Sequence, residues 1–236
     1  MCIVGAEALI RWPQADGSFI GPSEFIRVAE ETGLIGVLGE WILHESCQQA
    51  AHWHALGHIG VSVAVNLSPQ QFLRPGFPAL AQHVLEETGL PASALEIEIT
   101  EGVLMARSAE NVAALEALAA LGITLAIDDF GTGYSSLAYL QRFPVSVLKI
   151  DRSFTDGLGV EPGDTAIVTA IIAMAHSLEL RVVAEGVETA EQAVVLKAHG
   201  CRAAQGFHFS RAVAPEVFVA MLARGSLQSM RESAVS

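Results

Sequence analysis

Short apolar runs and longer helical patterns alternate along most of the chain. Seven runs of strand length are bounded by turn signals, and such runs are typical of buried strands. They cover residues 4–10, 59–67, 95–99, 123–127, 145–150, 181–184 and 201–207. Segments with a 3.6-residue apolar period separate most of them and predict helices. These segments cover residues 22–32, 37–56, 69–88, 109–121, 165–178, 190–199 and 215–223.

This alternation predicts an α/β fold, with a parallel sheet closed into a barrel and helices outside it. A barrel of this type has eight strands, whereas the pattern shows seven. We expect the eighth either upstream in a longer parent protein or in a short, unrecognised segment. The hydrophobic content of 51% is enough to fill a barrel interior and a helix layer. The sequence therefore predicts one domain over residues 1–225 and a polar tail over residues 226–236.

Nearly every apolar run ends in a residue that can hold a metal ion, a phosphate or a proton. The carboxyl ends of parallel strands meet on one face of a barrel, where active sites of this fold lie. The residues at these ends are Glu7, Asn66, Glu98, Asp128, Asp129, Lys149, Glu185 and Gln205. The sequence therefore predicts a polar site on that face.

Asp128 and Asp129 are adjacent acids at the end of a predicted strand. Two neighbouring anions destabilise each other unless cations compensate them. The following loop contains Gly131, Thr132 and Gly133, and its glycines allow a tight turn. An Asp-rich turn remains an alternative for this motif alone. A kinase is excluded because no glycine-rich nucleotide loop or catalytic-loop motif accompanies it.

Acids alternate with apolar residues from Glu96 to Glu101. Period-2 geometry places Glu96 and Glu98 on one strand face, with Glu98 nearer the strand end and so closer to Asp128. Glu101 follows in the loop. A half-exposed edge strand would show the same alternation, but the neighbouring runs are apolar on both faces and favour a central strand.

Three further residues allow more than one interpretation. Asn66 is either a turn or helix-cap residue, or a ligand for a hard cation. Glu7 lies inside an apolar run, where an unpaired charge is costly, so it needs a cation or a proton. Lys149 also lies inside an apolar run, where its positive charge is equally costly if it is unpaired. It is expected either in an ion pair with the site carboxylates or as a Schiff-base nucleophile.

Oxygen atoms dominate the candidate ligands. They favour Mg²⁺ or Mn²⁺ over zinc, which prefers histidine and cysteine. The candidates are Glu7, Asn66, Glu98, Asp128, Asp129 and Glu185. This set is larger than one partly hydrated Mg²⁺ would use. Sharing of Asp128 would give two ions about 4 Å apart, a geometry suited to phosphodiester hydrolysis.

Charge and cysteine content limit the partners. The formal net charge is −13, from 26 acids and 13 bases, which argues against a nucleic-acid polymer or an anionic membrane as partner. Bound cations would still permit an anionic substrate. Cys2, Cys47 and Cys201 show no paired spacing, which predicts reduced thiols and a cytoplasmic location. The most apolar helical stretch, residues 166–178, is too short to span a bilayer.

The motifs, taken in order, resemble the EAL-domain family of cyclic di-GMP phosphodiesterases, and the resemblance covers almost the whole chain. The motifs that carry it are Glu7-Ala8-Leu9-Ile10-Arg11-Trp12, Val65-Asn66-Leu67-Ser68, Glu98-Ile99-Thr100-Glu101, residues 128–136, Lys149-Ile150-Asp151, Glu185-Gly186-Val187-Glu188 and Gln205-Gly206-Phe207. The resemblance implies a modified TIM-type barrel whose first strand is antiparallel. That strand is expected to be missing or truncated here, because the family's Gln-Pro pair is not seen.

The resemblance also implies an activity, namely metal-dependent hydrolysis of one phosphodiester bond of cyclic di-GMP to linear pGpG. Two Mg²⁺ or Mn²⁺ ions are implied. The first would be held by Glu7, Asn66, Glu98 and Asp128. The second would be held by Asp128, Asp129 and Glu185.

Roles for the remaining residues follow from the same resemblance. Lys149 would hold the attacking water and Glu185 would act as general base. The implied substrate contacts are Arg11 (to a phosphate), Leu9, Asp151 and Gln205. Glu101 would steady the loop that contains Gly131, Thr132 and Gly133. Glu188 and Gln205 would complete the metal surroundings and the substrate pocket.

Two other functions are weighed against hydrolysis. A catalytically inactive cyclic di-GMP receptor would have lost ligands or the general base, and none is missing from the portion present. A Schiff-base lyase using Lys149 is disfavoured because surrounding carboxylates would keep its amine protonated. The resemblance further allows a homodimer and an upstream sensory or GGDEF-type domain in a longer parent.

Overall fold

The computed structural model describes residues 2–74, 76–105, 109–132, 140 and 142–224. Gly133 and the predicted tail over residues 226–236 lie outside this part of the chain. In the described part, a seven-stranded sheet has the order β1-β4-β5-β6-β7-β8-β9. Its strands are β1 (Gly5–Glu7), β4 (Ser62–Asn66), β5 (Leu95–Thr100), β6 (Thr124–Phe130), β7 (Val147–Ile150), β8 (Arg181–Ala184) and β9 (Ala203–Ala204).

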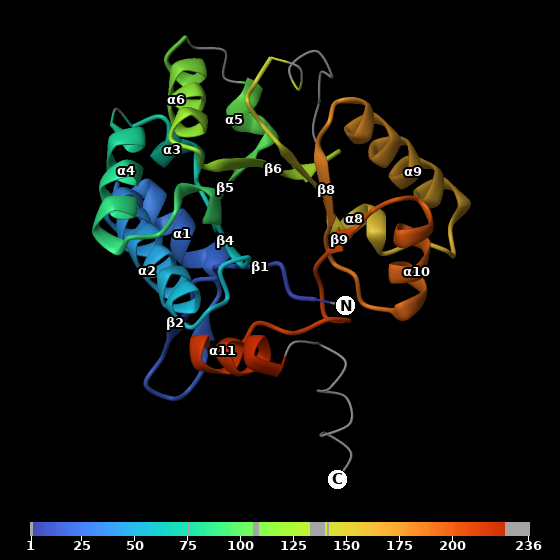
Figure 1. Ribbon diagram of the computed structural model, residues 1–236, viewed down its shortest axis with the longest axis horizontal. Coiled ribbons are helices and arrows are strands. Elements are labelled where there is room, and N and C mark those ends of the chain that lie inside the picture. Colours follow the sequence, from blue (N-terminus) through green and yellow to red (C-terminus); the bar gives the residue numbers. More distant parts are fainter. Residues whose placement is uncertain (1, 75, 106–108, 133–139, 141, 225–236) are drawn as a thin grey trace.

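Every neighbouring pair in this sheet is parallel. The predicted α/β class and all seven predicted strands are therefore confirmed. β5 lies between β4 and β6, which rules out the edge-strand interpretation of its alternating acids. Among the described residues no strand joins β9 to β1, so the sheet forms an open half-barrel (Figure 1).

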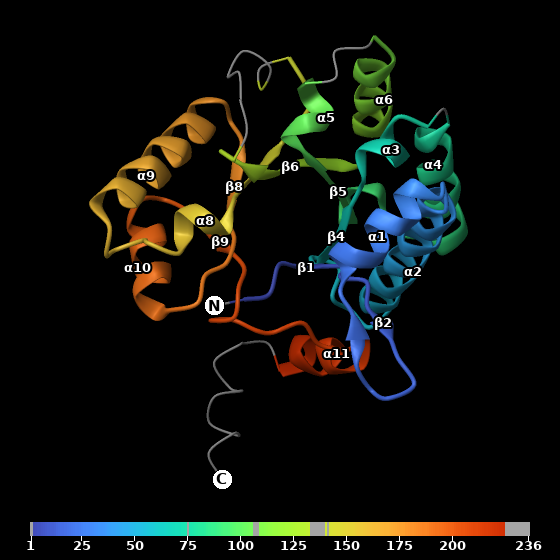
Figure 2. The same ribbon diagram turned by 180° about the vertical axis from the view of Figure 1, so that it is seen from behind.

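Helices lie outside the curved sheet, as both views of the ribbon show (Figures 1 and 2). The longer ones are α1 (Pro22–Glu31), α2 (Ile35–Ala55), α4 (Phe77–Thr88), α6 (Ala109–Ala120), α9 (Pro162–Ser177), α10 (Ala190–Ala198) and α11 (Pro215–Arg224). The shorter ones are α3 (Pro69–Phe72), η1 (Ala92–Ala94), α5 (Glu101–Met105) and α8 (Arg152–Thr155). Of the short elements, η1, α5 and α8 were not predicted, because single turns carry no apolar period.

The prediction of one helix over residues 69–88 is wrong. Ser68 caps α3 through the amide of Gln71, and α3 ends at Phe72. Gly76 then adopts a left-handed conformation with φ 92° immediately before α4, which interrupts any continuous helix. A two-stranded antiparallel hairpin, β2 (Trp12–Pro13) with β3 (Phe19–Ile20), was also missed.

The two faces of β5 show how the barrel separates its contents. Leu95, Ile97 and Ile99 are fully buried in the hydrophobic core that includes residues of the surrounding helices. Glu96 and Glu98 instead pair with residues of β8 and β7. Because those strands are not neighbours of β5, both acids must face the barrel interior. The predicted period-2 division of this strand is confirmed.

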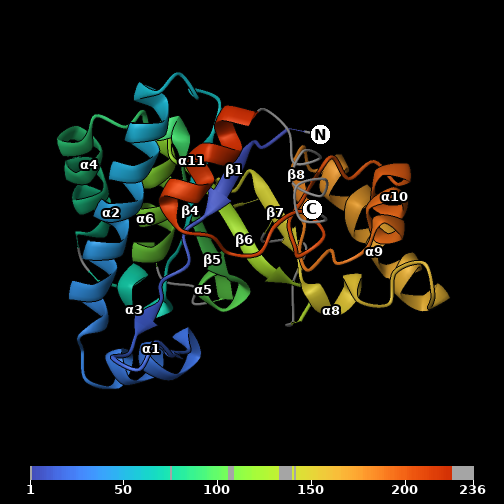
Figure 3. The same ribbon diagram turned by 90° about the horizontal axis from the view of Figure 1, so that it is seen from below.

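The two ends of the barrel carry different elements. α8 follows directly after β7, close to the carboxyl ends of β6 and β7 (Figure 3). α11 lies at the opposite end, because its Phe218 ring contacts Trp53 with a centroid separation of 4.7 Å, and Trp53 is near the end of the helix that precedes β4. The candidate site therefore lies at the α8 end.

Candidate active site

Lys149 is the centre of the candidate site. Its Nζ lies 2.6 Å from an oxygen of Glu185, 2.7 Å from Glu98, 3.0 Å from Asp128 and 3.8 Å from Glu7. These residues come from, or directly follow, β7, β8, β5, β6 and β1. Carboxylates up to 178 positions apart therefore surround one cation, as the strand-end pattern predicts.

The ammonium group of Lys149 is almost completely enclosed, with 2% of its side chain exposed. Burial alone would lower the pKa of Lys149, but the carboxylates of Glu98, Glu7, Glu185 and Asp128 raise it well above its usual range. The residue is therefore a protonated ion-pair partner. A protonated amine is not nucleophilic, which argues against the Schiff-base lyase.

The carboxylates outnumber the ammonium that they surround. Burial raises the pKa of Glu98 to about 9, with further contributions from Glu7 and Asp128, although Lys149 opposes the change. Burial also raises the pKa of Glu185 to about 7, again against Lys149. The site therefore holds more negative charge than its one lysine balances, and additional cations or protons are favoured there.

Asp128, Asp129 and Glu185 form the tightest group. Each contributes a carboxylate oxygen, and the three oxygens lie within 4.8 Å of one another. The Oε2 atom of Glu98 is buried and forms no hydrogen bond with the described residues. Close oxygen donors and an unpartnered buried carboxylate oxygen fit a hard divalent cation such as Mg²⁺ or Mn²⁺. The site is thus a candidate acidic metal site.

The backbone brings both adjacent aspartates into this region. Asp129 has a positive φ of 52°, and the pairing of β6 with β7 shifts register between Ile127 and Phe130. Adjacent side chains would otherwise point to opposite faces of a strand. The strand was expected to stop at Ile127, but β6 continues to Phe130. An irregular strand, instead of a simple Asp-rich turn, therefore carries the two acids.

Two amide side chains hold Glu7. Asn66 is the last residue of β4, and its Nδ2 donates to Glu7 Oε1 at 2.7 Å. Gln205 Nε2 lies 2.8 Å from both Glu7 Oε2 and Glu185 Oε1. The neighbouring cap of α3 is Ser68, so Asn66 is not the helix cap. Asn66 thus joins β4 to β1, and Gln205, which follows β9, joins the ends of β1 and β8.

Glu101 contacts the beginning of the predicted glycine loop. Its Oε1 accepts a hydrogen bond of 2.7 Å from the amide of Gly131, and Thr132 Oγ1 donates to the carbonyl of Asp129 at 2.9 Å. The structure therefore places Glu101 where it can hold the segment that follows the two aspartates. Gly133, the next predicted loop residue, lies outside the described residues.

The predicted substrate contacts Leu9, Arg11 and Asp151, and also Glu188, are not among the ion-pair partners of Lys149 in the described part of the chain. Leu9 and Arg11 follow β1 and are exposed. Asp151 caps α8 by accepting hydrogen bonds from the amide and hydroxyl of Ser153. These bonds lower the pKa of Asp151 although burial opposes them. The carboxylate of Glu188 lies 2.9 Å from Arg152, so it has an ion-pair partner outside the Lys149 cluster.

Thr155 and Gln192 were not among the predicted site residues. Thr155 Oγ1 donates to the carbonyl of Glu185, and the Gln192 side chain accepts from the amide of Glu188. Thr189 and Gln192 form a capping box at the start of α10. The Thr-x-x-Gln spacing is a recognisable helix-start signal, so it could have indicated Gln192. No sequence signal indicates Thr155.

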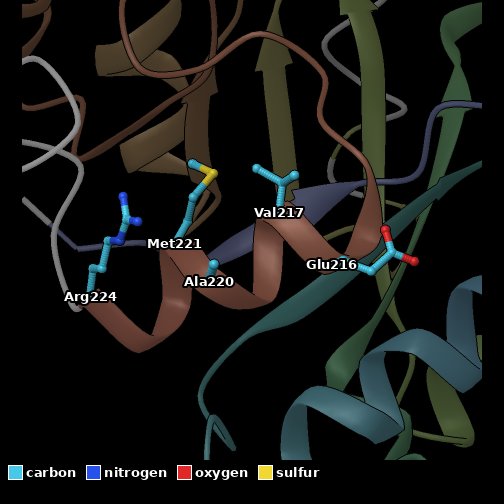
Figure 4. A pocket seen from close by; sticks show the side chains of 5 residues that line it. All are labelled: Glu216, Val217, Ala220, Met221 and Arg224. Atoms are coloured by element: carbon cyan, nitrogen blue, oxygen red, sulfur yellow. The ribbon is translucent and has the colours of Figure 1, made fainter. Parts of the chain in front are cut away.

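A separate cavity of about 330 Å³ lies against α11 (Figure 4). Its lining consists of Glu216, Val217, Ala220, Met221 and Arg224. None of the carboxylates around Lys149 contributes to it, and α11 is at the opposite end of the barrel. The cavity is therefore distinct from the candidate metal site.

The fold and the site define an α/β half-barrel protein with a candidate acidic metal site at the strand ends. Residues 2–212 match the EAL domain family. The chain belongs to this family.

Relatives and a solved structure agree with this assignment. The signaling protein YkoW of Bacillus subtilis is 48% identical over 216 residues, which are 92% of this chain and 27% of YkoW. MucR of Pseudomonas aeruginosa, a bifunctional diguanylate cyclase/cyclic di-GMP phosphodiesterase, is 43% identical over 221 residues, 94% of this chain and 32% of MucR. A structure of the PaMucR phosphodiesterase in a c-di-GMP complex matches with a TM-score of 0.87 and 44% identity, covering 91% of this chain and 87% of that one.

The chain spans about a quarter to a third of the length of these two relatives. Among the residues that the structure describes, no helix has both the length and the apolar character needed to cross a bilayer.

Proposed function

We propose that this chain hydrolyses one phosphodiester bond of cyclic di-GMP, giving linear pGpG, with the help of two Mg²⁺ or Mn²⁺ ions. The observation that carries the proposal is the convergence of Glu7, Glu98, Asp128 and Glu185 on one buried position. The family membership supplies the substrate class, since a relative 44% identical forms a c-di-GMP complex.

The ligand set is the one that the family resemblance implies, and the convergence supports it. Glu7, Asn66, Glu98 and Asp128 would hold one ion, while Asp128, Asp129 and Glu185 would hold the other. Ions bound there would lower the pKa of a water molecule and stabilise charge on the phosphoryl oxygens. They would also offset the excess negative charge that otherwise repels a phosphodiester.

Two side chains of the protein would act directly in the reaction, one as proton acceptor and one as hydrogen-bond donor. Water attacks the phosphorus atom, one P–O ester bond breaks, and the leaving oxygen takes up a proton. Glu185 would accept the proton of the attacking water, since its carboxylate lies 2.6 Å from Lys149 Nζ, the group that would hold this water. Lys149 keeps its proton and can donate a hydrogen bond to the water oxygen or to the developing negative charge.

Residues on the rim would bind and orient the substrate. The exposed guanidinium of Arg11 suits a phosphate, which it can bind through two hydrogen bonds. Leu9, two positions earlier in the chain, offers an exposed apolar side chain. Gln205 fixes the carboxylates of Glu7 and Glu185 relative to each other. Glu101 holds the amide of Gly131 and with it the start of the loop.

A product assay with one variant tests the proposal. Purified protein is incubated with cyclic di-GMP and Mg²⁺ or Mn²⁺, and the products are separated by chromatography. We expect linear pGpG from the parent chain and a loss of at least about 10²-fold in rate for Glu185→Ala, because removal of a general base has an effect of this size. Glu40→Gln, an exposed acid on α2, is the control and should retain the parent rate.

The outcomes separate hydrolysis from the alternatives. Tight binding of cyclic di-GMP without turnover by the parent chain would support a receptor and contradict the proposal. Equal activity of Glu185→Ala and Glu40→Gln would remove Glu185 from the mechanism. Trapping of a substrate adduct on Lys149 by borohydride would support a lyase.

A further inference from the structure

The main chain of residues 185–188 carries Glu185 and Glu188 away from β8. Part of this segment is held by backbone hydrogen bonds, since the amide of Glu185 donates to Ile150 and the amide of Val187 donates to Gln205, both at 3.0 Å. The carbonyl of Glu185 and the amide of Glu188 bond to side chains instead, namely those of Thr155 and Gln192. The position of Glu185 therefore depends on side chains as well as on the sheet.

Thr155 is on α8 and is completely buried. Its hydroxyl lies 2.5 Å from the carbonyl of Glu185 and 2.9 Å from the carbonyl of Arg152. A threonine in a helix commonly bonds only to a carbonyl of its own preceding turn. Here the same hydroxyl also reaches the residue after β8, so it couples α8 to the segment that holds the candidate general base.

Gln192 completes the connection from α10. Its side-chain oxygen accepts from the amides of Glu188 at 2.8 Å and Thr189 at 3.0 Å. Its Nε2 lies 2.9 Å from the carbonyl of Thr155 and 3.5 Å from that of Asp156. The side chain is buried, and both ends of its amide have partners. Loss of either end would leave a buried polar group unsatisfied.

The space between α8 and the segment is also closely filled. Gly186 has a φ of +65°, and a Cβ at this position would lie 2.3 Å from Cγ of Arg152. Arg152 in turn forms the 2.9 Å ion pair with Glu188. The segment therefore has little room to shift without disturbing α8.

We propose that Thr155 and Gln192 are positioning residues that fix the Glu185 carboxylate against Lys149 and Gln205. A role of these two residues in catalysis rests on the proposed function above. Glu185 Oε1 lies 2.6 Å from Lys149 Nζ and 2.8 Å from Gln205 Nε2. A backbone shift of even 1 Å would break both contacts, and misplacement of this size can reduce a rate about 10²-fold.

The test compares three threonine substitutions. Thr155→Val removes the hydroxyl with little change of shape, whereas Thr155→Ser retains the hydroxyl. Thr88→Val is the matched control, because its hydroxyl bonds to the carbonyl of Val84 at 2.7 Å on α4, away from the site. We expect Thr155→Val to weaken Mn²⁺ binding and to lower kcat about 10- to 100-fold, the usual effect of losing a group that orients a metal ligand.

The separate effects on KM and kcat distinguish a positioning role from a general loss of structure. KM for cyclic di-GMP should stay within about two-fold, since in the described part of the chain the Thr155 hydroxyl bonds to no predicted substrate-binding residue, while the rate falls by the factor above. Thr155→Ser should restore both Mn²⁺ affinity and kcat. If Thr155→Val equals Thr88→Val in Mn²⁺ affinity and kcat, the inference is overturned, whatever the change in Tm.

Gln192→Glu gives a second test if Thr155→Val does not fold. The variant keeps an oxygen for the amides of Glu188 and Thr189 but places another oxygen against the carbonyl of Thr155. We expect faster hydrogen exchange at the amides of residues 185–189 in the metal-free protein, and lower Mn²⁺ affinity. Unchanged exchange and affinity would contradict the role of Gln192.

These readouts also separate the two proposals. If the parent chain does not hydrolyse cyclic di-GMP, the proposed function fails. Hydrogen exchange in metal-free protein and Mn²⁺ affinity would still show whether Thr155 and Gln192 position Glu185.

Discussion

The barrel contains two groups of paired charges, and they are built differently. Glu96 and Glu98 lie on the same face of β5, two residues apart. Glu96 pairs with Arg181 at 2.6 Å, one acid with one base. Glu98 belongs to the group in which the single ammonium of Lys149 meets Glu7, Glu98, Asp128 and Glu185.

The difference shows how one strand can serve stability and function. A one-to-one pair balances its charge and has no need of a further ion. The Lys149 group has more acids than bases. It therefore attracts cations, and its excess negative charge lowers the stability of the metal-free protein. The charge ratio and the burial of the base therefore both distinguish the candidate site from the pair of Glu96 with Arg181.

Removal of Lys149 should produce the largest contrast between the two groups. In Lys149→Met the remaining carboxylates lose the base that pairs with them among the described residues, so we expect the metal-free protein to lose about 3–5 kcal/mol of unfolding free energy. Mn²⁺ should recover much of this loss by supplying positive charge. Urea unfolding with EDTA and with Mn²⁺ measures both effects.

Lys197→Met is the control for that experiment. Lys197 is the chain's other lysine and is exposed on α10. Its replacement should change stability by less than about 0.5 kcal/mol. Equal losses in the two variants would show that the unbalanced group has no special dependence on its ammonium.

The pH dependence of the metal-free protein should give the next largest effect. The folded-state pKa is about 7 for Glu185 and about 9 for Glu98, above the unfolded value of about 4.3. The folded state therefore binds more protons than the unfolded state, and stability falls as pH rises from about 4.5 through these values. For Glu185 the change is roughly 3–4 kcal/mol at most.

Thermal unfolding in EDTA between pH 5 and pH 9 measures this dependence. Glu185→Gln should flatten the lower half of the curve, because its amide does not titrate. Saturating Mn²⁺ should abolish the fall, since the cation stabilises the ionised carboxylates. A metal-free Tm that rises across this range would contradict the assigned direction.

Disruption of the balanced pair should have the smallest effect. Arg181→Met leaves Glu96 without its base, but 53% of the Arg181 side chain is exposed and solvent weakens the interaction. Burial raises the pKa of Glu96 although Arg181 and Lys149 oppose it, so Glu96 can take up a proton. We expect a loss of about 1 kcal/mol by urea unfolding, with Mn²⁺ affinity unchanged. A marked loss of Mn²⁺ affinity would show that the two groups act as one.

The strands and most helices could be predicted because their information is local. The apolar run from Leu95 to Ile99 and the glycine-ended helices each carry a complete pattern within a few turns. The break before α4 was missed although the sequence signals it, because the Pro75-Gly76 pair is a typical helix breaker. The short β2–β3 hairpin and α8 contain too few residues to show any period.

The site residues at strand ends could be predicted for a similar reason. Glu7 and Lys149 stand inside apolar runs, where their charge is conspicuous. Thr155 gives no such signal, since its contact with Glu185 depends on how α8 packs after β7. The ion pair of Glu188 with Arg152 also depends on tertiary packing. Sequence pattern thus identifies which side chains are chemically unusual, but not which ordinary residues hold them.

The bridge formed by Gln205 has a consequence for how the protein is made. Its amide joins Glu7, 198 positions earlier, to Glu185, 20 positions earlier. At typical rates of translation, Glu7 leaves the ribosomal active centre roughly 10–40 s before Gln205 is added. A nascent chain therefore carries both carboxylates without the donor that ties them together, and the acidic face is complete only when synthesis has passed the last strand.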